Sequence, residues 1–185
     1  TVGSTFNNKN VGTGKTVTVN SITLANGSNG GLAANYSISA GQTTTANITA
    51  KALTVSGISA SNKTYDGNSD GTTTLTLSGF IGSETITNTN LSSFNNKNIG
   101  NGKTVTVNSI TLANGLNGGL ASNYSISAGQ TTTANITAKA LTVSGITSSN
   151  KTYDSNTTAT LDISSLSYSG LVPGDDFSGT FSGVF

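Results

Sequence analysis

The chain has 185 residues, with eight lysines, seven acidic residues and a formal net charge of +1. It contains no cysteine, histidine, methionine, tryptophan or arginine, which excludes disulfide bonds, thiolate zinc sites and an imidazole general base. Because the lysines are spread thinly and the apolar runs are short, we also expect no nucleic-acid partner and no insertion of this segment into a membrane. We predict no cofactor and no metal ion.

Alternation of apolar and polar residues runs through most of the chain, and it is typical of strands with one buried face. From the N-terminus, the strands that it predicts lie at residues 16–24, 36–38, 43–50 and 52–55. The apolar residues Val17 and Val19 occupy odd positions, whereas Ile22 occupies an even one. This change in the alternation predicts a bulge or turn at Asn20-Ser21. The glycine- and asparagine-rich residues 25–35 predict a long turn with a short helical stretch at its end.

The sequence repeats itself with a period of 88 residues. Between positions 6–66 and 94–154, 55 of 61 residues are identical, so each repeat has a fixed part, which is followed by a variable part. One predicted strand runs into the next without glycine or proline but with its inward face switched, which places repeat boundaries near Ala50-Lys51 and Ala138-Lys139.

We therefore predict a mainly β chain of small tandem modules, joined almost without linker into an elongated array. The predicted domains are the C-terminal part of a repeat at 1–50, a complete repeat at 51–138 and the N-terminal part of the next repeat at 139–185. Because Thr1 is not a natural start, we expect the chain to come from a longer protein.

The stretch VGTGKT at 11–16 returns as IGNGKT at 99–104, and both look like the end of a nucleotide-binding P-loop. A P-loop requires a further glycine five residues before the second one, and a helix after it. Lys9 and Lys97 stand where that glycine is needed, and a strand-like segment follows, so nucleotide binding is not expected. We interpret the stretch as a turn between strands, in which the glycines permit positive φ and the lysine begins an exposed strand.

Three stretches carry a resemblance to a known family: ALTVSGISASNKTYDGN at 52–68, FNNKNIGNGKTVTVNSITLANG at 94–115 and NYSISAGQTTTANITAKALT at 123–142. They resemble the YDG-type repeat, related to mirror β-grasp modules, of large bacterial surface proteins of the filamentous-haemagglutinin and two-partner-secretion type. The name-giving residues correspond to Tyr65-Asp66-Gly67 and Tyr153-Asp154-Ser155. The resemblance implies β-grasp-like or β-sandwich-like modules in an extracellular stalk or fibre, and it names no ligand.

The sequence Lys63-Thr64-Tyr65-Asp66, repeated as Lys151-Thr152-Tyr153-Asp154, has two interpretations. In one, the acid and the ring contact a sugar or a cation. In the other, which we favour, it is a structural corner in which the tyrosine ring is buried, the hydroxyl bonds to backbone, and the aspartate caps a turn.

Two further hypotheses concern chemistry at single positions. A Lys–Asn amide crosslink needs a buried lysine, an asparagine and a nearby carboxyl group, and Lys9 and Asn10 are candidates for it. Asp175 and Asp176 in VPGDDFSG are candidate calcium ligands, although an ordinary solvated turn also explains them. Since no acid/base pair recurs at a usable spacing, we predict no catalytic residues and no enzyme activity.

The sequence therefore predicts a structural stalk or fibre repeat of a bacterial extracellular adhesin or surface filament. The expected partners are neighbouring repeats, identical chains and host or surface glycans. Phe185 aligns with Phe6 and Phe94, so chains that end there would complete one another by strand addition. The alternative is a carbohydrate- or ice-binding surface built from Thr-x-Thr rows such as TVTV at 16–19 and TTTLTLS at 72–78.

Overall fold

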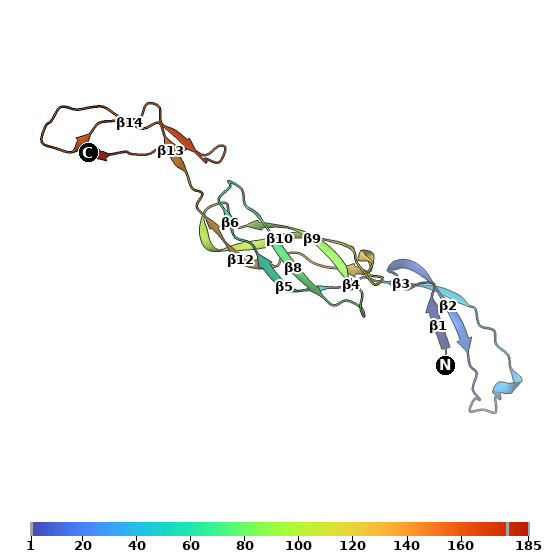
Figure 1. Cartoon of the computed structure of the whole chain (residues 1–185). Coiled ribbons are helices and arrows are strands. Elements are labelled where there is room, and N and C mark those ends of the chain that lie inside the picture. The colour runs from blue at the N-terminus through green and yellow to red at the C-terminus, as the bar shows by residue number, and fades with distance from the viewer. Residues whose placement is uncertain (1, 177, 185) are drawn as a thin grey trace. The chain divides into compact units, whose positions relative to one another are not determined.

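The structure is a computed structural model that describes residues 2–176 and 178–184; Phe185 lies outside the described residues. Within these residues strands predominate, and the helical elements are two single-turn 3₁₀ helices, η1 (Ala33–Asn35) and η2 (Ala121–Asn123). The expected mainly β fold is thus confirmed, and the short helical stretch predicted at the end of the long turn is present in both copies (Figure 1).

The chain divides into two compact units, each assembled from separate parts of the sequence. Unit 1 comprises residues 1–56, 76–89 and 110–127, and unit 2 comprises 57–75, 90–109 and 128–185. The segments that contribute to each unit come from two neighbouring repeats, so each unit contains a place where one repeat meets the next.

Unit 1 begins with an antiparallel sheet of β1 (Val2–Phe6), β2 (Gly12–Ile22) and β3 (Thr43–Ile48), in the order β1-β2-β3. Gly3 lies opposite Ser21 and Ser4 opposite Val19, so Asn20 has no partner on β1. This register confirms the bulge that the change of hydrophobic phase predicts.

A second part of unit 1 is built around β4 (Lys51–Ala52) and β11 (Tyr124–Ser125), which pair in parallel. Its buried side chains are Leu53, Ile86 and Tyr124, with Leu77, Phe80, Leu112 and Ile126 packed against them. The strand predicted at 36–38, by contrast, is absent. Tyr36 corresponds to Tyr124, but no counterpart of β4 pairs with it in the described structure, and an isolated strand leaves its backbone groups without partners.

Unit 2 contains the larger sheet, whose strand order is β6-β12-β10-β9-β7. These strands are β6 (Lys63–Thr64), β12 (Thr131–Thr137), β10 (Gly100–Asn114), β9 (Ile86–Phe94) and β7 (Asp70–Gly71), of which β9 and β10 also contribute residues to unit 1. Phe94, Val105, Ala134 and Ile136 form the core on one face, as the alternation predicts.

The remaining strands form two-stranded pairs. These are β5 (Thr54–Ala60) with β8 (Thr73–Ser78), β13 (Thr142–Ser144) with β17 (Ser167–Ser169), β14 (Thr147–Ser148) with β16 (Leu161–Asp162), and β15 (Thr158–Ala159) with β18 (Gly183–Val184). The described residues contain no helix with the length and apolar character that crossing a membrane requires.

The turn between β1 and β2 lies at residues 7–11, and residues 12–16 of the glycine stretch already belong to β2, so the turn predicted within this stretch lies before its glycines. Gly12 pairs with Ile48 and Lys15 with Ala46, which makes the stretch a bulge opposite Asn47. Gly14 has a φ of +59°, which confirms the positive φ expected for this stretch. Its N–H donates to the Asn47 side chain over 2.8 Å.

The expectation that Lys15 begins an exposed strand is also wrong, because the Lys15 side chain is buried. Lys15 is in the same phase as Val17 and Val19, which directs its aliphatic stem inward. The ammonium group donates to the Asn8 side chain, and Lys103 donates to Asn96 in the same way.

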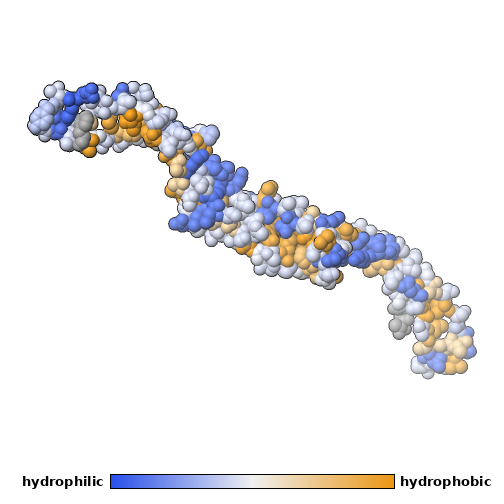
Figure 2. Space-filling view, in the orientation of Figure 1, coloured by the Kyte–Doolittle hydropathy of each residue, from blue (hydrophilic) through white to orange (hydrophobic). Residues whose placement is uncertain are grey.

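Identical residues of neighbouring repeats differ in exposure. Phe94 and Tyr124 are 3% and 6% exposed, whereas their counterparts Phe6 and Tyr36 are 39% and 71% exposed. Figure 2 shows apolar side chains at the surface near β1 and β2 and near β13 and β14. Local sequence is the same in each pair, so the surrounding strands decide whether the side chain is buried.

Candidate functional site

Two clusters join parts of the chain that belong to different repeats, and we term them the first and second junctions. The first junction, in unit 1, joins Lys9, Asn10 and Val11 to Glu84, Asn123 and Tyr124. The second junction, in unit 2, joins Tyr65 and Gly67 to Val172 and Asp175, and the Lys97 ammonium group lies near Tyr65. Both are built from side chains in turns and at strand ends.

Glu84 is the centre of the first junction. One of its carboxylate oxygens is 3.1 Å from the Lys9 ammonium nitrogen, and the other accepts a hydrogen bond of 2.7 Å from the Tyr124 hydroxyl. The Tyr124 hydroxyl in turn accepts the backbone N–H of Ile81 over 3.1 Å. The carboxylate is therefore held by its own repeat through Tyr124 and contacts the preceding repeat through Lys9.

Asn123 adds two uncharged hydrogen bonds to the first junction. Its side-chain oxygen accepts the Val11 N–H over 2.9 Å, and its amide nitrogen donates to the Asn10 side chain over 3.1 Å. A pocket of about 270 Å³ lies beside these groups and is lined partly by Glu84 and Tyr124. Because the pairing uses both ends of one amide, it fixes the orientation of Asn123.

Charge and hydrogen bonding reinforce one another at Glu84. The hydrogen bond from Tyr124, followed by that from Lys9, holds the pKa of Glu84 below its ordinary value. The same hydrogen bond to the carboxylate raises the pKa of Tyr124. At neutral pH the cluster therefore consists of an ionised carboxylate between a neutral phenol and an ammonium group.

Tyr65 is the centre of the second junction. It follows β6, its backbone N–H donates to the Thr137 carbonyl over 2.9 Å, and its ring packs against the core formed by Phe94 and its neighbours. The hydroxyl donates to an Asp175 carboxylate oxygen over 2.7 Å. The structural-corner interpretation predicts a buried ring in both copies, but Tyr65 is half-buried and Tyr153 is 90% exposed. The Tyr65 hydroxyl bonds to a side chain of another repeat and not to backbone, so this part of the prediction is wrong.

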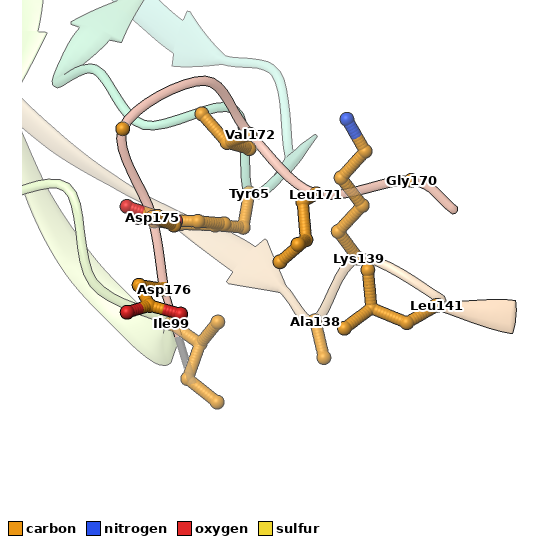
Figure 3. Close-up of a pocket in the computed structure, with 11 residues that line it drawn as sticks. Tyr65, Ile99, Ala138, Lys139, Leu141, Gly170, Leu171, Val172, Asp175 and Asp176 are labelled. Carbon is orange, nitrogen blue, oxygen red and sulfur yellow. Dashed lines mark hydrogen bonds between the residues drawn. The ribbon is translucent and has the colours of Figure 1, made fainter. Parts of the chain in front are cut away.

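A pocket of about 490 Å³ lies next to this hydrogen bond (Figure 3). Tyr65, Leu171 and Val172 contribute to its lining, and Val172 also packs so close to Gly67 that a Cβ there would lie 2.6 Å from it. Gly67 has a φ of +85°, so this position favours glycine for both its backbone and its contact. Ser155, its counterpart, adopts a φ of +61°.

Electrostatics at Tyr65 parallel those at Tyr124. The hydrogen bond to Asp175, followed by partial burial, raises the pKa of Tyr65, and the nearby Lys97 ammonium opposes that rise. Lys97 is the counterpart of Lys9, 88 residues later in the sequence. A tyrosine, a carboxylate and a lysine thus meet at each junction.

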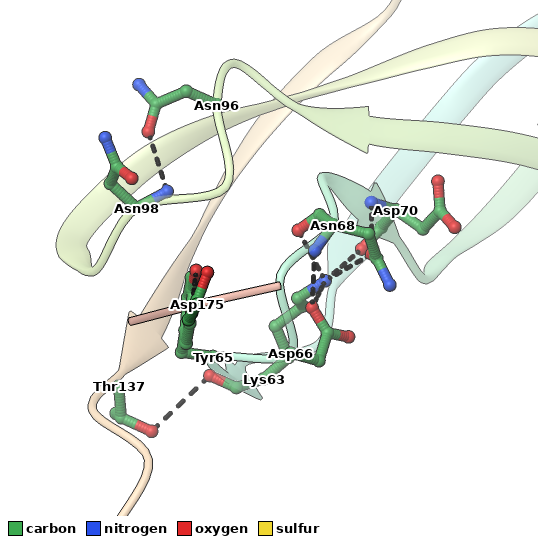
Figure 4. A network of polar contacts seen from close by, with 9 residues as sticks. All are labelled: Lys63, Tyr65, Asp66, Asn68, Asp70, Asn96, Asn98, Thr137 and Asp175. Atoms are coloured by element: carbon green, nitrogen blue, oxygen red, sulfur yellow. Dashed lines mark hydrogen bonds and ion pairs between the residues drawn. The ribbon is translucent and has the colours of Figure 1, made fainter. Parts of the chain in front are cut away.

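Lys63 organises the turn that follows Tyr65 (Figure 4). Its ammonium group is 2.7 Å from an Asp66 carboxylate oxygen and donates to the side-chain oxygen of Asn68 over 2.8 Å. It also donates to the carbonyls of Asn68 and Asp70. The Asp66 carboxylate accepts the Asn68 N–H over 3.2 Å, so the predicted turn-capping role of this aspartate is confirmed.

The structure brings together a lysine, an asparagine and an acid at Lys63, Asn68 and Asp66, and again at Lys151, Asn156 and Asp154. Lys9 and Asn10, the candidates for an amide crosslink, point to different partners. Lys63 is instead ion-paired with Asp66 at 2.7 Å, and Lys151 with Asp154 at 2.7 Å. These clusters are therefore better described as ion pairs that close a turn.

We expect the Lys63 cluster to make the stability depend on pH. The hydrogen bond from Lys63 lowers the pKa of Asp66 below its unfolded value of about 3.9, and Lys151 does the same for Asp154. A lowered carboxyl pKa gives a stabilisation that is complete above the unfolded pKa and is lost as the pH falls through the folded pKa. The stability should therefore decline from about pH 5 to below pH 3.

The paired variant Asp66→Asn/Asp154→Asn should flatten this decline, measured as the urea midpoint at pH 6 and at pH 3. Asp176→Asn is the control, since Asp176 is exposed. A decline as steep in the paired variant as in the parent chain would show that these carboxylates do not cause it.

The sequence analysis missed most of the first junction. Glu84 and Tyr124 were not singled out, and Asp175 was considered only as a calcium ligand or as part of a solvated turn. In the structure Asp175 accepts the Tyr65 hydrogen bond. A signal was present in the variable parts: FIGSET at 80–85 aligns with LVPGDD at 171–176, which places Glu84 opposite Asp175. The described residues contain no group of three or more acidic side chains suited to a metal ion.

The Thr-x-Thr rows form a ladder on the face of the sheet opposite the core. On β10 and β12, Thr104 lies opposite Thr133 and Thr106 opposite Thr131. Val105 and Val107, between these threonines, are fully buried. The hydroxyl and methyl groups of the ladder thus lie on the outer side of the sheet.

Comparison with known proteins gives one family. The family described as the YDG domain matches residues 1–46, 49–134 and 137–185. Neither the curated proteins nor the solved structures include a match to the chain.

Proposed function

The chain belongs to the YDG domain family, and from this premise we propose that it is a structural stalk or fibre segment of a bacterial extracellular adhesin or surface filament. In this role the segment supplies length and stiffness and performs no catalysis. The family matches follow one another with two residues between them, which supports a tandem array without flexible linkers.

The observation that carries this proposal is a contact between a carboxylate of one repeat and a donor of the preceding repeat at both junctions. Glu84 lies 3.1 Å from the Lys9 ammonium nitrogen at the first junction, and Asp175 accepts the Tyr65 hydrogen bond over 2.7 Å at the second. Charge-assisted contacts between repeats resist bending, because a bend would separate the carboxylate from its donor in the neighbouring repeat.

Surface labelling tests the location. Antibodies raised against residues 1–185 should bind intact cells of the source organism, and brief protease treatment of those cells should remove the signal. An antibody to a cytoplasmic protein is the control for cell integrity. Binding that occurs only after permeabilisation would contradict an extracellular stalk.

We also propose that identical chains can associate by strand complementation. Residues 1–50 correspond to the second part of the middle repeat and residues 139–176 to its first part. Leu141, the counterpart of buried Leu53, is 37% exposed, and Tyr36, the counterpart of Tyr124, is also exposed. Leu53 and Tyr124 belong to one core cluster, so Leu141 of one chain and Tyr36 of another would pack in the same way.

Sedimentation velocity tests this association. The parent chain should form larger species as its concentration rises, and Leu141→Ser should remain monomeric. Leu91→Ser makes the same change at a leucine that is 71% exposed in the middle repeat, and it should behave as the parent. A parent chain that stays monomeric at every concentration would contradict the proposal.

A second candidate function is binding of carbohydrate or ice by the threonine ladder of β10 and β12. The cross-strand threonine pairs favour it, because they repeat hydroxyl and methyl groups at the regular spacing of a sheet. An ice-recrystallisation assay and a glycan array test it, with Thr104→Val/Thr133→Val as the control variant. No inhibition of recrystallisation and no glycan signal for the parent chain would exclude this function.

A further inference from the structure

The two junctions use equivalent positions, although the residues that contribute differ. Glu84 and Asp175 occupy the same position of the aligned variable parts, and Lys9 and Lys97 are one repeat apart. In each junction the acid belongs to the following repeat and contacts the preceding one, through Lys9 in the first case and Tyr65 in the second. The same carboxylate position therefore receives donors from two different sites of the preceding repeat.

We propose that both junctions are partial views of one docking site. The tyrosine of the Tyr-Asp sequence and the lysine of the Asn-Asn-Lys-Asn sequence on one repeat together bind the carboxylate in the variable part of the next repeat. A second tyrosine, which belongs to the same repeat as the carboxylate and donates to it, completes the site. At the first junction this tyrosine is Tyr124. The occupant of this surface is a following YDG domain with an acid at the position of Glu84 or Asp175.

Each observed junction contains three of these four groups. The first has Lys9, Glu84 and Tyr124, and residues 1–185 include no counterpart of Tyr65 for it. The second has Tyr65, Asp175 and the nearby Lys97, and residues 1–185 include no counterpart of Tyr124 for it. A junction with all four groups would give the carboxylate two phenol donors and one ammonium donor, and its four lone-pair sites can accept all three.

The docking site explains the contrast between the two Tyr-Asp sequences. Tyr65 is half-buried and bonded to Asp175, whereas Tyr153, with the same neighbours in sequence, is 90% exposed. An exposed tyrosine at this position is what the site requires before a following repeat docks. The surface at Tyr153 is thus the docking surface for the acidic turn of a further YDG domain, in continuity with the contact that Tyr65 makes.

A double-mutant cycle in the whole chain tests the second junction. Tyr65→Phe and Asp175→Asn should each raise the hydrogen-exchange rate of the Asp175 amide, which donates to the Val172 carbonyl, by roughly three- to tenfold. The double variant should exchange no faster than either single one, because both remove the same charge-assisted hydrogen bond. Lys97→Met should give a smaller increase, because the proposed lysine donor is lost while the Tyr65 hydrogen bond to Asp175 remains.

Two matched controls separate docking from general effects. Tyr153→Phe makes the same change at the equivalent exposed tyrosine, and Asp176→Asn makes it at the adjacent exposed acid; both should leave the exchange rate unchanged. Independent, additive effects of Tyr65→Phe and Asp175→Asn, or an equal effect of Tyr153→Phe, would overturn the proposal.

A second measurement needs no destabilising variant. In the parent chain, the ¹³Cζ resonance of Tyr65 should titrate above the ordinary tyrosine pKa of about 10. In Asp175→Asn the pKa of Tyr65 should move back toward the ordinary value. A Tyr65 titration that Asp175→Asn leaves unchanged would also overturn the docking site.

This inference rests on the proposed stalk function, since it assumes that one repeat follows another. The outcomes are distinguishable. Failure of the cycle with intact surface labelling would refute the docking site alone, whereas a confirmed cycle without surface labelling would refute the location alone.

Discussion

Phe94→Ala is expected to lower the free energy of unfolding by about 3–5 kcal/mol. Phe94 is almost completely buried and packs with Val105, Ala134 and Ile136 in the core of unit 2. Removing the ring takes away its transfer free energy and leaves a cavity that the strands cannot close. The change should appear as a lower urea midpoint in far-UV circular dichroism and tyrosine fluorescence.

Phe6→Ala is the matched control, because Phe6 stands at the equivalent position, with the same following sequence Asn-Asn-Lys-Asn, and is 39% exposed. We expect it to cost about 1 kcal/mol or less. Equal losses for Phe6→Ala and Phe94→Ala would mean that both repeats bury this ring to the same extent, contrary to the structure.

Gly119→Ala should have the second-largest effect, with a loss of about 2–3 kcal/mol or more. A Cβ at Gly119 would lie 1.9 Å from the Thr85 carbonyl oxygen and 2.9 Å from its carbon, and these are backbone atoms that cannot rotate away. The turn of residues 115–119 is fixed against Thr85 by the hydrogen bond from the Thr85 N–H to the Leu116 carbonyl. The same urea measurement checks this prediction.

Gly31→Ala provides the control for this steric effect. Gly31 is the counterpart of Gly119, and a Cβ there would meet no atom within 4 Å. Any gain from restricting the unfolded chain is the same in both variants, so their difference isolates the clash. If Gly119→Ala proved as harmless as Gly31→Ala, the close approach of the turn to Thr85 would be wrong.

These paired predictions also show how far the sequence determines the fold. Alternation of Val105 and Val107 with threonine correctly predicts a strand and its buried face, and the change of phase at Ile22 correctly predicts the bulge at Asn20. Both are local properties that period-2 patterning encodes. The same alternation places Lys15 on the inward face with Val17 and Val19. An exposed strand was expected there because lysine is charged, although its position in the alternation indicates burial.

Tertiary context could not be predicted in the same way. Tyr36 and Tyr124 have the same neighbours in sequence, yet only Tyr124 pairs with β4 and is buried. The junctions depend on contacts across many residues, such as the 110 that separate Tyr65 from Asp175. The identical repeats revealed the lysine and tyrosine, but the acid lies in the variable part, where no internal copy marks it.

The central claim is that tandem YDG domains form a stiff segment, and small-angle X-ray scattering of the whole chain tests it most directly. A compact globule of this length has a radius of gyration of roughly 16 Å. We predict a value well above this, with a distance distribution extended to long distances, and a broader distribution in Tyr65→Phe than in Tyr153→Phe. A radius near that of the globule would contradict the stalk.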